Sequence, residues 1–193
     1  MNKPESVITN QIEPGMDIVL TKWIGLEGTV KIMEAKEQEL SQKLPRHLLE
    51  TARGFSSYLS IQKEQDFAAA HKVPMVFPAA EGGIFSALWN MAEPFRVGLE
   101  IQLRMIPVRQ ETIEICEQFR LNPYLLCSNG AVLMADWRGY DLVDCLKKEG
   151  IACTVIGKAV KGNDRILYNE EEQRFLDRPQ KDELYKILEP QEV

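Results

Sequence analysis

The chain has 193 residues, of which 45% are hydrophobic and 27% are charged. These proportions are typical of a globular domain that can bury a core of its own. The formal net charge is −6 and lysine and arginine form no cluster, so we expect no nucleic-acid partner. No apolar run approaches the ~20 residues that a transmembrane helix requires, so we expect no membrane partner either.

The four cysteines form no CxxC pair and match no zinc template, so we predict no metal site and no cofactor. They are Cys116, Cys127, Cys145 and Cys153. A nucleophilic cysteine would need a nearby histidine, and both His47 and His71 fall in stretches expected to be helical surface. Three of the four cysteines lie in apolar, periodic stretches and are interpreted as small hydrophobic residues. Together with the missing secretion signal, they predict a cytoplasmic protein.

The first half of the chain alternates short apolar runs with helical patterns. Residues 1–15 are polar and are interpreted as a lead-in segment, and residues 16–193 as a single domain. A β-rich run at 17–23 predicts a strand, and apolar residues at three- and four-residue steps predict a long helix over 26–44. Further elements are expected as helices from Pro45 and over 62–71, a strand at 73–77, and a helix opening at Gly82-Gly83.

The second half has strands at 97–103, 131–135 and 151–156, separated by helices at 109–119 and 140–149. This order is that of a ferredoxin-like βαβαβ portion within an α+β domain that has a mixed sheet and covering helices. A hairpin over 165–176 and a closing helix over 181–188 complete the prediction.

Two glycine turns lie between a strand and a helix. In the first, Gly25, Gly28 and Thr29 form either a backbone nest that binds a phosphate or carboxylate, or a purely structural turn. Lys22 is the neighbouring residue favoured to add positive charge. The Glu27 carboxylate counts against an external anion, because it could fold back onto the same donors.

The second turn, Glu81-Gly82-Gly83, has the same placement, and a structural turn is again the simpler interpretation. One hypothesis is that the two turns converge on one site. The candidate ligand-binding residues are Lys22, Gly25, Glu27, Gly28, Thr29, Glu81, Gly82 and Gly83. We assign no catalytic residue.

Several segments together resemble the C-terminal domain of the AIR synthetase superfamily, which includes thiamine-monophosphate kinase, selenophosphate synthetase and the hydrogenase expression/formation protein. The segments are 14–28, 81–93, 97–101, 106–112, 127–133 and 150–157. The resemblance is strongest to the AIR-synthase-related, hydrogenase-maturation-like branch. It implies an AIR synthetase C-terminal-domain-like fold, and it implies that the N-terminal ATP-binding half is absent.

The sequence departs from the family pattern just before the second turn. Pro78 stands where the family has an acid or imidazole, and Ala80 where it has threonine, and neither can transfer a proton or ligate a metal. We therefore expect a non-catalytic or regulatory protein that binds a small anionic ligand. The alternative is the C-terminal half of a split ATP-dependent enzyme whose ATP-binding domain is a separate chain. We also expect a homodimer, because domains of this kind pack against their missing half.

Overall fold

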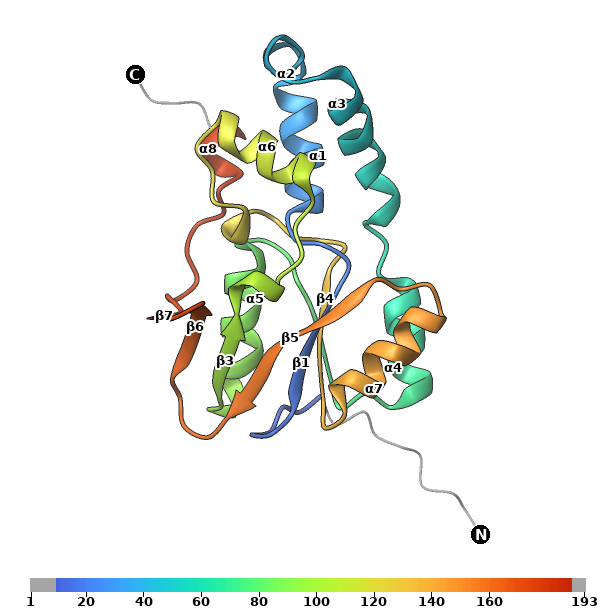
Figure 1. The fold of residues 1–193 in the computed structure, drawn as a ribbon, viewed down its shortest axis with the longest axis vertical. Helices are drawn as coiled ribbons and strands as arrows, with labels where there is room; N and C mark the ends of the chain where they lie inside the picture. The colour runs from blue at the N-terminus through green and yellow to red at the C-terminus, as the bar shows by residue number, and fades with distance from the viewer. Residues whose placement is uncertain (1–9, 189–193) are drawn as a thin grey trace.

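A computed structural model describes residues 10–188 of the chain, and residues 1–9 and 189–193 lie outside the described part (Figure 1). The strands are β1 (Asp17–Thr21), β2 (Met75–Pro78), β3 (Gly98–Gln102), β4 (Val132–Asp136), β5 (Cys153–Val160), β6 (Arg165–Asn169) and β7 (Glu172–Phe175). The α-helices are α1 (Leu26–Ala35), α2 (Glu37–Lys43), α3 (Arg46–Arg53), α4 (Gln62–His71), α5 (Gly83–Ala92), α6 (Gln110–Gln118), α7 (Gly139–Lys148) and α8 (Tyr185–Leu188). Short 3-10 turns are η1 (Gly54–Tyr58), η2 (Glu93–Phe95), η3 (Leu103–Met105) and η4 (Pro123–Leu125).

The seven strands form one mixed sheet in the order β2-β4-β1-β5-β3-β6-β7. All neighbouring pairs are antiparallel except β3 and β6, which are parallel. β4 and β5 are both antiparallel to β1, which lies between them, and α7 connects them. This is the split βαβ arrangement of ferredoxin-like folds, so the predicted α+β class and its mixed sheet are confirmed.

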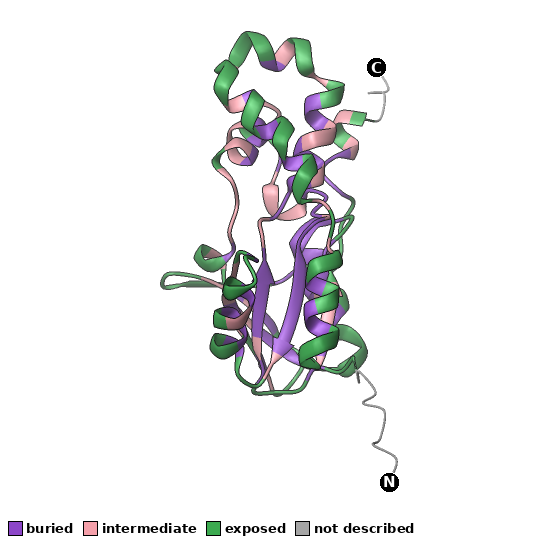
Figure 2. Ribbon diagram, turned by 90° about the vertical axis from the view of Figure 1, so that its right-hand side faces the viewer, coloured by how far each residue is buried: buried purple, intermediate pink, exposed green. Residues whose placement is uncertain are grey.

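The two faces of the sheet bury different side chains of the same strands, because successive residues of a strand point to opposite sides. In β1, Ile18 and Leu20 lie in a core that α5 covers, whereas Val19 lies in a second core that α4 and α7 cover. Figure 2 shows the strands as a buried layer with exposed helix surfaces outside it. The residues of α5 that recur at helical spacing and face the sheet are buried, namely Ile84, Leu88 and Met91.

A third core lies among the helices beyond one end of the sheet, where α1, α2, α3, α6 and α8 gather (Figure 1). Its largest fully buried side chains are Leu26, Ile32, Leu40 and Phe55. This helical part is joined to the sheet by the connection that follows β1, so the first glycine turn lies at the boundary between the two parts.

Several predicted elements differ from the structure, among them the strand expected at 151–156, which runs from Cys153 to Val160 as β5. The helix expected over 26–44 is broken at Lys36 into α1 and α2, although neither glycine nor proline marks the break. The break lets Leu40 of α2 join the helical core with Leu49 of α3. The strand expected over 17–23 ends at Thr21, and the closing helix expected over 181–188 is limited to α8.

Within residues 10–188, no helix has the length and apolar character needed to cross a bilayer. Ile12 of the expected lead-in segment is 1% exposed and lies in the core that α5 covers. The N–H of Gln11 donates to the carbonyl of Pro74. Residues 11 and 12 of the lead-in therefore pack on the rest of the domain. Residues 1–9 of that segment lie outside the described part. The division at residue 15 stays a prediction.

Candidate functional site

Both glycine turns place a left-handed glycine directly before a helix. Gly25 has φ of 71° before α1, and Gly82 has φ of 78° before α5. Residues with a Cβ adopt this conformation less readily, so the backbone favours glycine at both positions. Neither helix has a side chain capping its first turn from the residue that precedes it.

The two turns converge on one segment of the chain, residues 126–129, which we call the 126–129 loop. The N–H of Gly25 donates to Oγ of Ser128 at 2.9 Å, and the N–H of Gly28 donates to the carbonyl of Cys127 at 3.0 Å. On the other side, the N–H of Ser128 donates to the carbonyl of Ala80 at 3.1 Å. The loop therefore bridges two turns that are far apart in the sequence.

The first turn is closed by contacts within the chain. The N–H groups of Gly25 and Gly28 are both used by the 126–129 loop, and the Thr29 hydroxyl donates to the carbonyl of Gly25 at 2.7 Å. A Cβ at Gly28 would lie 2.3 Å from Cγ of Leu126. These contacts explain the glycines by close packing, and they favour the structural interpretation of this turn.

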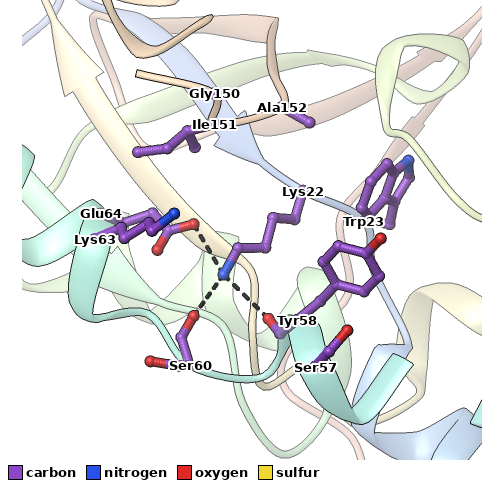
Figure 3. A pocket seen from close by; sticks show the side chains of 10 residues that line it. All are labelled: Lys22, Trp23, Ser57, Tyr58, Ser60, Lys63, Glu64, Gly150, Ile151 and Ala152. Atoms are coloured by element: carbon purple, nitrogen blue, oxygen red, sulfur yellow. Dashed lines mark hydrogen bonds and ion pairs between the residues drawn. The ribbon is translucent and has the colours of Figure 1, made fainter. Parts of the chain in front are cut away.

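The structure does not bring Lys22 to the first turn. Its ammonium group lies 3.0 Å from the carbonyl of Tyr58, 2.6 Å from that of Ser60 and 2.8 Å from the Glu64 carboxylate (Figure 3). The ammonium group therefore has two hydrogen bonds and one ion pair within the chain. The charge that was expected at Gly25–Gly28 is therefore committed to another part of the molecule.

The Glu27 carboxylate points to the 126–129 loop. It accepts hydrogen bonds from the thiol of Cys127 at 3.0 Å and from the amide of Asn129, and Lys31 lies 3.3 Å away. Burial by itself would raise the pKa of Glu27, but the bonds from Cys127, Asn129 and Lys31 outweigh it and hold that pKa below its ordinary value. Glu27 is therefore a charged acceptor that holds the loop against α1.

Cys127 has the surroundings of a structural thiol. Burial, followed by its hydrogen bond to the Glu27 carboxylate, raises the pKa of Cys127 to about 12. A thiol in that state donates a hydrogen bond and is a poor nucleophile at neutral pH. His47 and His71 are both exposed, and neither contacts Cys127 through a hydrogen bond. The geometry thus offers no Cys–His pair.

The second turn is closed by a residue that the sequence analysis did not single out. Asp182 accepts hydrogen bonds from the N–H of Gly82 at 2.7 Å, of Leu184 at 2.8 Å and of Cys127 at 3.2 Å. It is only 3% exposed. An aspartate two residues before Leu184 suggests a local cap for the closing helix, but no signal in the sequence links it to Gly82.

The other residues of the second turn are also engaged. The Glu81 carboxylate accepts a hydrogen bond from the Tyr185 hydroxyl at 2.8 Å, and the N–H of Gly83 donates to Ala80. A Cβ at Gly83 would lie 2.4 Å from the carbonyl oxygen of Tyr124. The C-terminal segment therefore covers this turn through both Asp182 and Tyr185.

We call the set formed by Glu27, Gly82, Cys127, Asn129 and Asp182 the two-turn cluster. It combines two carboxylates with backbone amides that point at one of them, and it has no group suited to proton transfer at neutral pH. In residues 10–188 no group of three or more histidine, cysteine, aspartate or glutamate side chains is arranged to hold a metal ion. The amides of Gly82 and Cys127 are satisfied within the chain by the Asp182 carboxylate.

The sequence from 13 to 169 matches the family described as AIR synthase related protein, C-terminal domain. The chain belongs to this family. Among curated proteins no sequence matches it. The predicted resemblance is thus confirmed at the level of the domain family.

Solved structures with the same fold include Escherichia coli HypE, with a TM-score of 0.72 and 18% identity. A crystal structure of the hydrogenase maturation protein HypE in complex with ATP has a TM-score of 0.66 and 14% identity. Both comparisons cover 93% of this chain and 54% of the other chain. Thiamine-monophosphate kinase from Stenotrophomonas maltophilia has a TM-score of 0.62 and 12% identity, over 85% of this chain and 53% of that one. This AIR-synthase-related chain spans about half the length of these proteins.

Proposed function

We propose that this AIR-synthase-related domain is non-catalytic and regulatory, and that it binds a small anionic ligand at the two-turn cluster. The observation that carries the proposal is the Asp182 carboxylate, which three backbone N–H groups surround. Backbone amides at the start of a helix favour negative charge. A phosphate or carboxylate from solution has the same kind of acceptor, and it satisfies the N–H groups of Gly82 and Cys127 once Asp182 moves away.

The regulatory character rests on where Asp182 comes from. It lies just before α8, in the C-terminal segment that reaches the start of α5 (Figure 1). A ligand that replaces Asp182 frees this segment, and Tyr185 then loses its position next to Glu81. Ligand binding is thereby coupled to the position of α8, because the ligand and Asp182 compete for the same donors.

The non-catalytic character rests on the residues around the cluster. Pro78 and Ala80 have no titratable group, and Cys127 is held as a neutral thiol. Glu81 is the remaining acid of the second turn, and its carboxylate is exposed and bonded to Tyr185. This set contains no pair of an acid and a base that is suited to transfer a proton at neutral pH.

A phosphate titration of wild-type protein and of Asp182→Ala tests the anion site by calorimetry. We expect the variant to bind inorganic phosphate at least tenfold more tightly, because its three N–H groups have lost their internal acceptor. Asp177→Ala, an exposed aspartate of the same segment, should behave like the wild type. Equal phosphate affinity in all three proteins, or turnover of ATP by the pure chain, would overturn the proposal.

The half-length coverage favours a second candidate, in which the chain is the C-terminal half of an ATP-dependent enzyme and another polypeptide supplies the ATP-binding half. A neighbouring gene for such a half would identify the partner. Co-purification of the two chains, with ATP turnover that neither has alone and that Glu81→Ala abolishes, would establish this function in place of the first.

We also propose that the protein is cytoplasmic. All four cysteines are free, and two of them, Cys116 and Cys127, are buried. Unpaired cysteines suit a compartment that keeps thiols reduced. Fractionation of the source cells, probed with an antibody to the chain, tests the location, and recovery outside the cytosol would contradict it.

A further inference from the structure

A cavity of about 300 Å³ lies beside the start of α4 and shares no lining residue with the two-turn cluster (Figure 3). Its walls come from the connection after β1, from η1, from α4 and from the connection between α7 and β5. Ligand pockets in proteins begin at about this volume, which suits a molecule with a single ring. The cavity goes beyond the proposed function, since none of its residues takes part in that function.

Glu64 is the unusual residue of this cavity. It is fully buried, and one of its oxygens, Oε1, lies 2.8 Å from the ammonium group of Lys22. Among the described residues, neither carboxylate oxygen has a hydrogen-bond donor, and Lys22 is the ion-pair partner of the carboxylate. Buried carboxylates are normally supplied with several donors, because desolvation of a charge is costly. The carboxylate therefore has an acceptor that the chain itself leaves unused.

Lys22 cannot supply the missing donor. Its ammonium group donates to the carbonyls of Tyr58 and Ser60 and is ion-paired with Glu64 without a hydrogen bond to either carboxylate oxygen, as the contacts in Figure 3 show. Its backbone is held in the left-handed region at φ of 55°, with its N–H bonded to the carbonyl of Ala152 at 2.7 Å. Strained residues of this kind persist where the surrounding structure holds them. Lys22 is thus immobilised as the counter-charge of Glu64.

The charges around the cavity limit what it can hold. Lys22 already neutralises Glu64, so a cationic ligand would meet the ammonium groups of Lys22 and of Lys63 at the rim. An anionic ligand would meet the unpaired oxygen of Glu64. A neutral molecule that donates hydrogen bonds avoids both repulsions and gives the buried carboxylate its missing partner.

The remaining walls favour a flat ligand. The rings of Trp23 and Tyr58 lie edge to face with centroids 5.4 Å apart, and both line the cavity. Ile151 and Ala152 add an apolar wall from the connection before β5. We propose that this cavity binds a small, uncharged, planar molecule that donates N–H groups to Glu64, a class that includes primary carboxamides, lactams and nucleobases.

Three related probes test the proposal on the wild-type chain. Benzamide has a flat ring and two N–H donors, N,N-dimethylbenzamide keeps the ring and the carbonyl without these donors, and benzoate is the anion of similar shape. We expect benzamide to shift the backbone amide signals of Ser60, Glu64 and Ala152 in ¹H–¹⁵N spectra. The other two probes should bind at least tenfold more weakly.

A matched pair of variants tests the role of the carboxylate. Glu64→Gln keeps the size of the side chain and removes its charge, so benzamide affinity should fall at least fivefold, because charge-assisted bonds are about twice as strong as neutral ones. Glu50→Gln, at an exposed position of α3, should bind like the wild type. If Glu64→Gln fails to fold, the comparison of the three probes on the wild type still tests whether the cavity recognises N–H donors.

Three results would overturn the proposal. Equal affinity for benzamide and its dimethyl derivative would mean that the ring alone binds and that Glu64 receives no N–H group. Tighter binding of benzoate would assign the cavity to anions and to Lys63. No binding of any probe at millimolar concentration would leave Lys22 and Glu64 as a structural link whose free oxygen is met by water.

Discussion

The carboxylate of Asp182 accepts a hydrogen bond of 2.7 Å from the backbone N–H of Gly82, 100 residues earlier in the chain. The same carboxylate accepts from Cys127, which is itself bonded through its thiol to Glu27. One chain of contacts therefore joins the start of α5, the 126–129 loop, α1 and the C-terminal segment. The following predictions test its parts.

Gly28→Ala should destabilise the protein. The new Cβ would lie 2.3 Å from Cγ of the fully buried Leu126. Overpacking of this kind costs about 1–3 kcal/mol, more than the gain of up to ~1 kcal/mol from better helix propensity. Urea unfolding measures the difference. Gly54→Ala is the control, because a Cβ at Gly54 would meet no atom within 4 Å and its φ of −65° suits alanine. A Gly28→Ala protein with unchanged free energy of unfolding would contradict the packing argument.

Cys127 should resist alkylation in the folded protein. With a pKa of about 12, its thiolate fraction at pH 8 is on the order of 1,000-fold smaller than that of an ordinary cysteine. Cys145 is only partly buried and should be modified first. Mass spectrometry after timed iodoacetamide exposure reports both sites, with urea-unfolded protein as reference. Rapid labelling of Cys127 at pH 8 would show that its thiol is activated.

Glu27→Gln should destabilise the protein at pH 7 and have little effect in acid. The pKa of Glu27 is lowered in the folded state, so its contribution is complete above the ordinary glutamate pKa and is lost as the pH falls through the lowered value. We expect a loss of about 1–2 kcal/mol at pH 7 that shrinks below about pH 4. Urea unfolding at both pH values measures it. Glu34→Gln, exposed on the same helix, is the control, and a loss independent of pH would contradict the assignment.

The chain should form a homodimer in solution. Several large hydrophobic side chains are strongly exposed, among them Tyr140 at 70%, Phe175 at 67% and Trp137 at 53%. Where exposed side chains of this kind form a contiguous patch, assembly commonly covers it, and a symmetric dimer is the commonest form. Light scattering should give twice the 22.0 kDa of one chain. The mass of a single chain over a wide concentration range would remove the prediction.

Local patterns were sufficient for much of the fold. The β-rich run at 17–23 predicted the strand that the structure buries on both faces, and helical spacing of Ile84 and Leu88 indicates the inner face of α5. The break at Lys36 was missed, because no glycine or proline marks it. It depends on Leu40 packing in the helical core, which is a tertiary contact.

The sequence by itself determined the family, the fold class and the two glycine turns, because a glycine between a strand and a helix imposes a local backbone conformation that its neighbours reveal. Only the tertiary structure decided that both turns meet the 126–129 loop, that Lys22 turns away to Glu64, and that Asp182 closes the second turn. These contacts join residues from about 40 to more than 100 positions apart. Their partners are chosen by the packing of whole elements, and periodicity within a short window has no information about that packing.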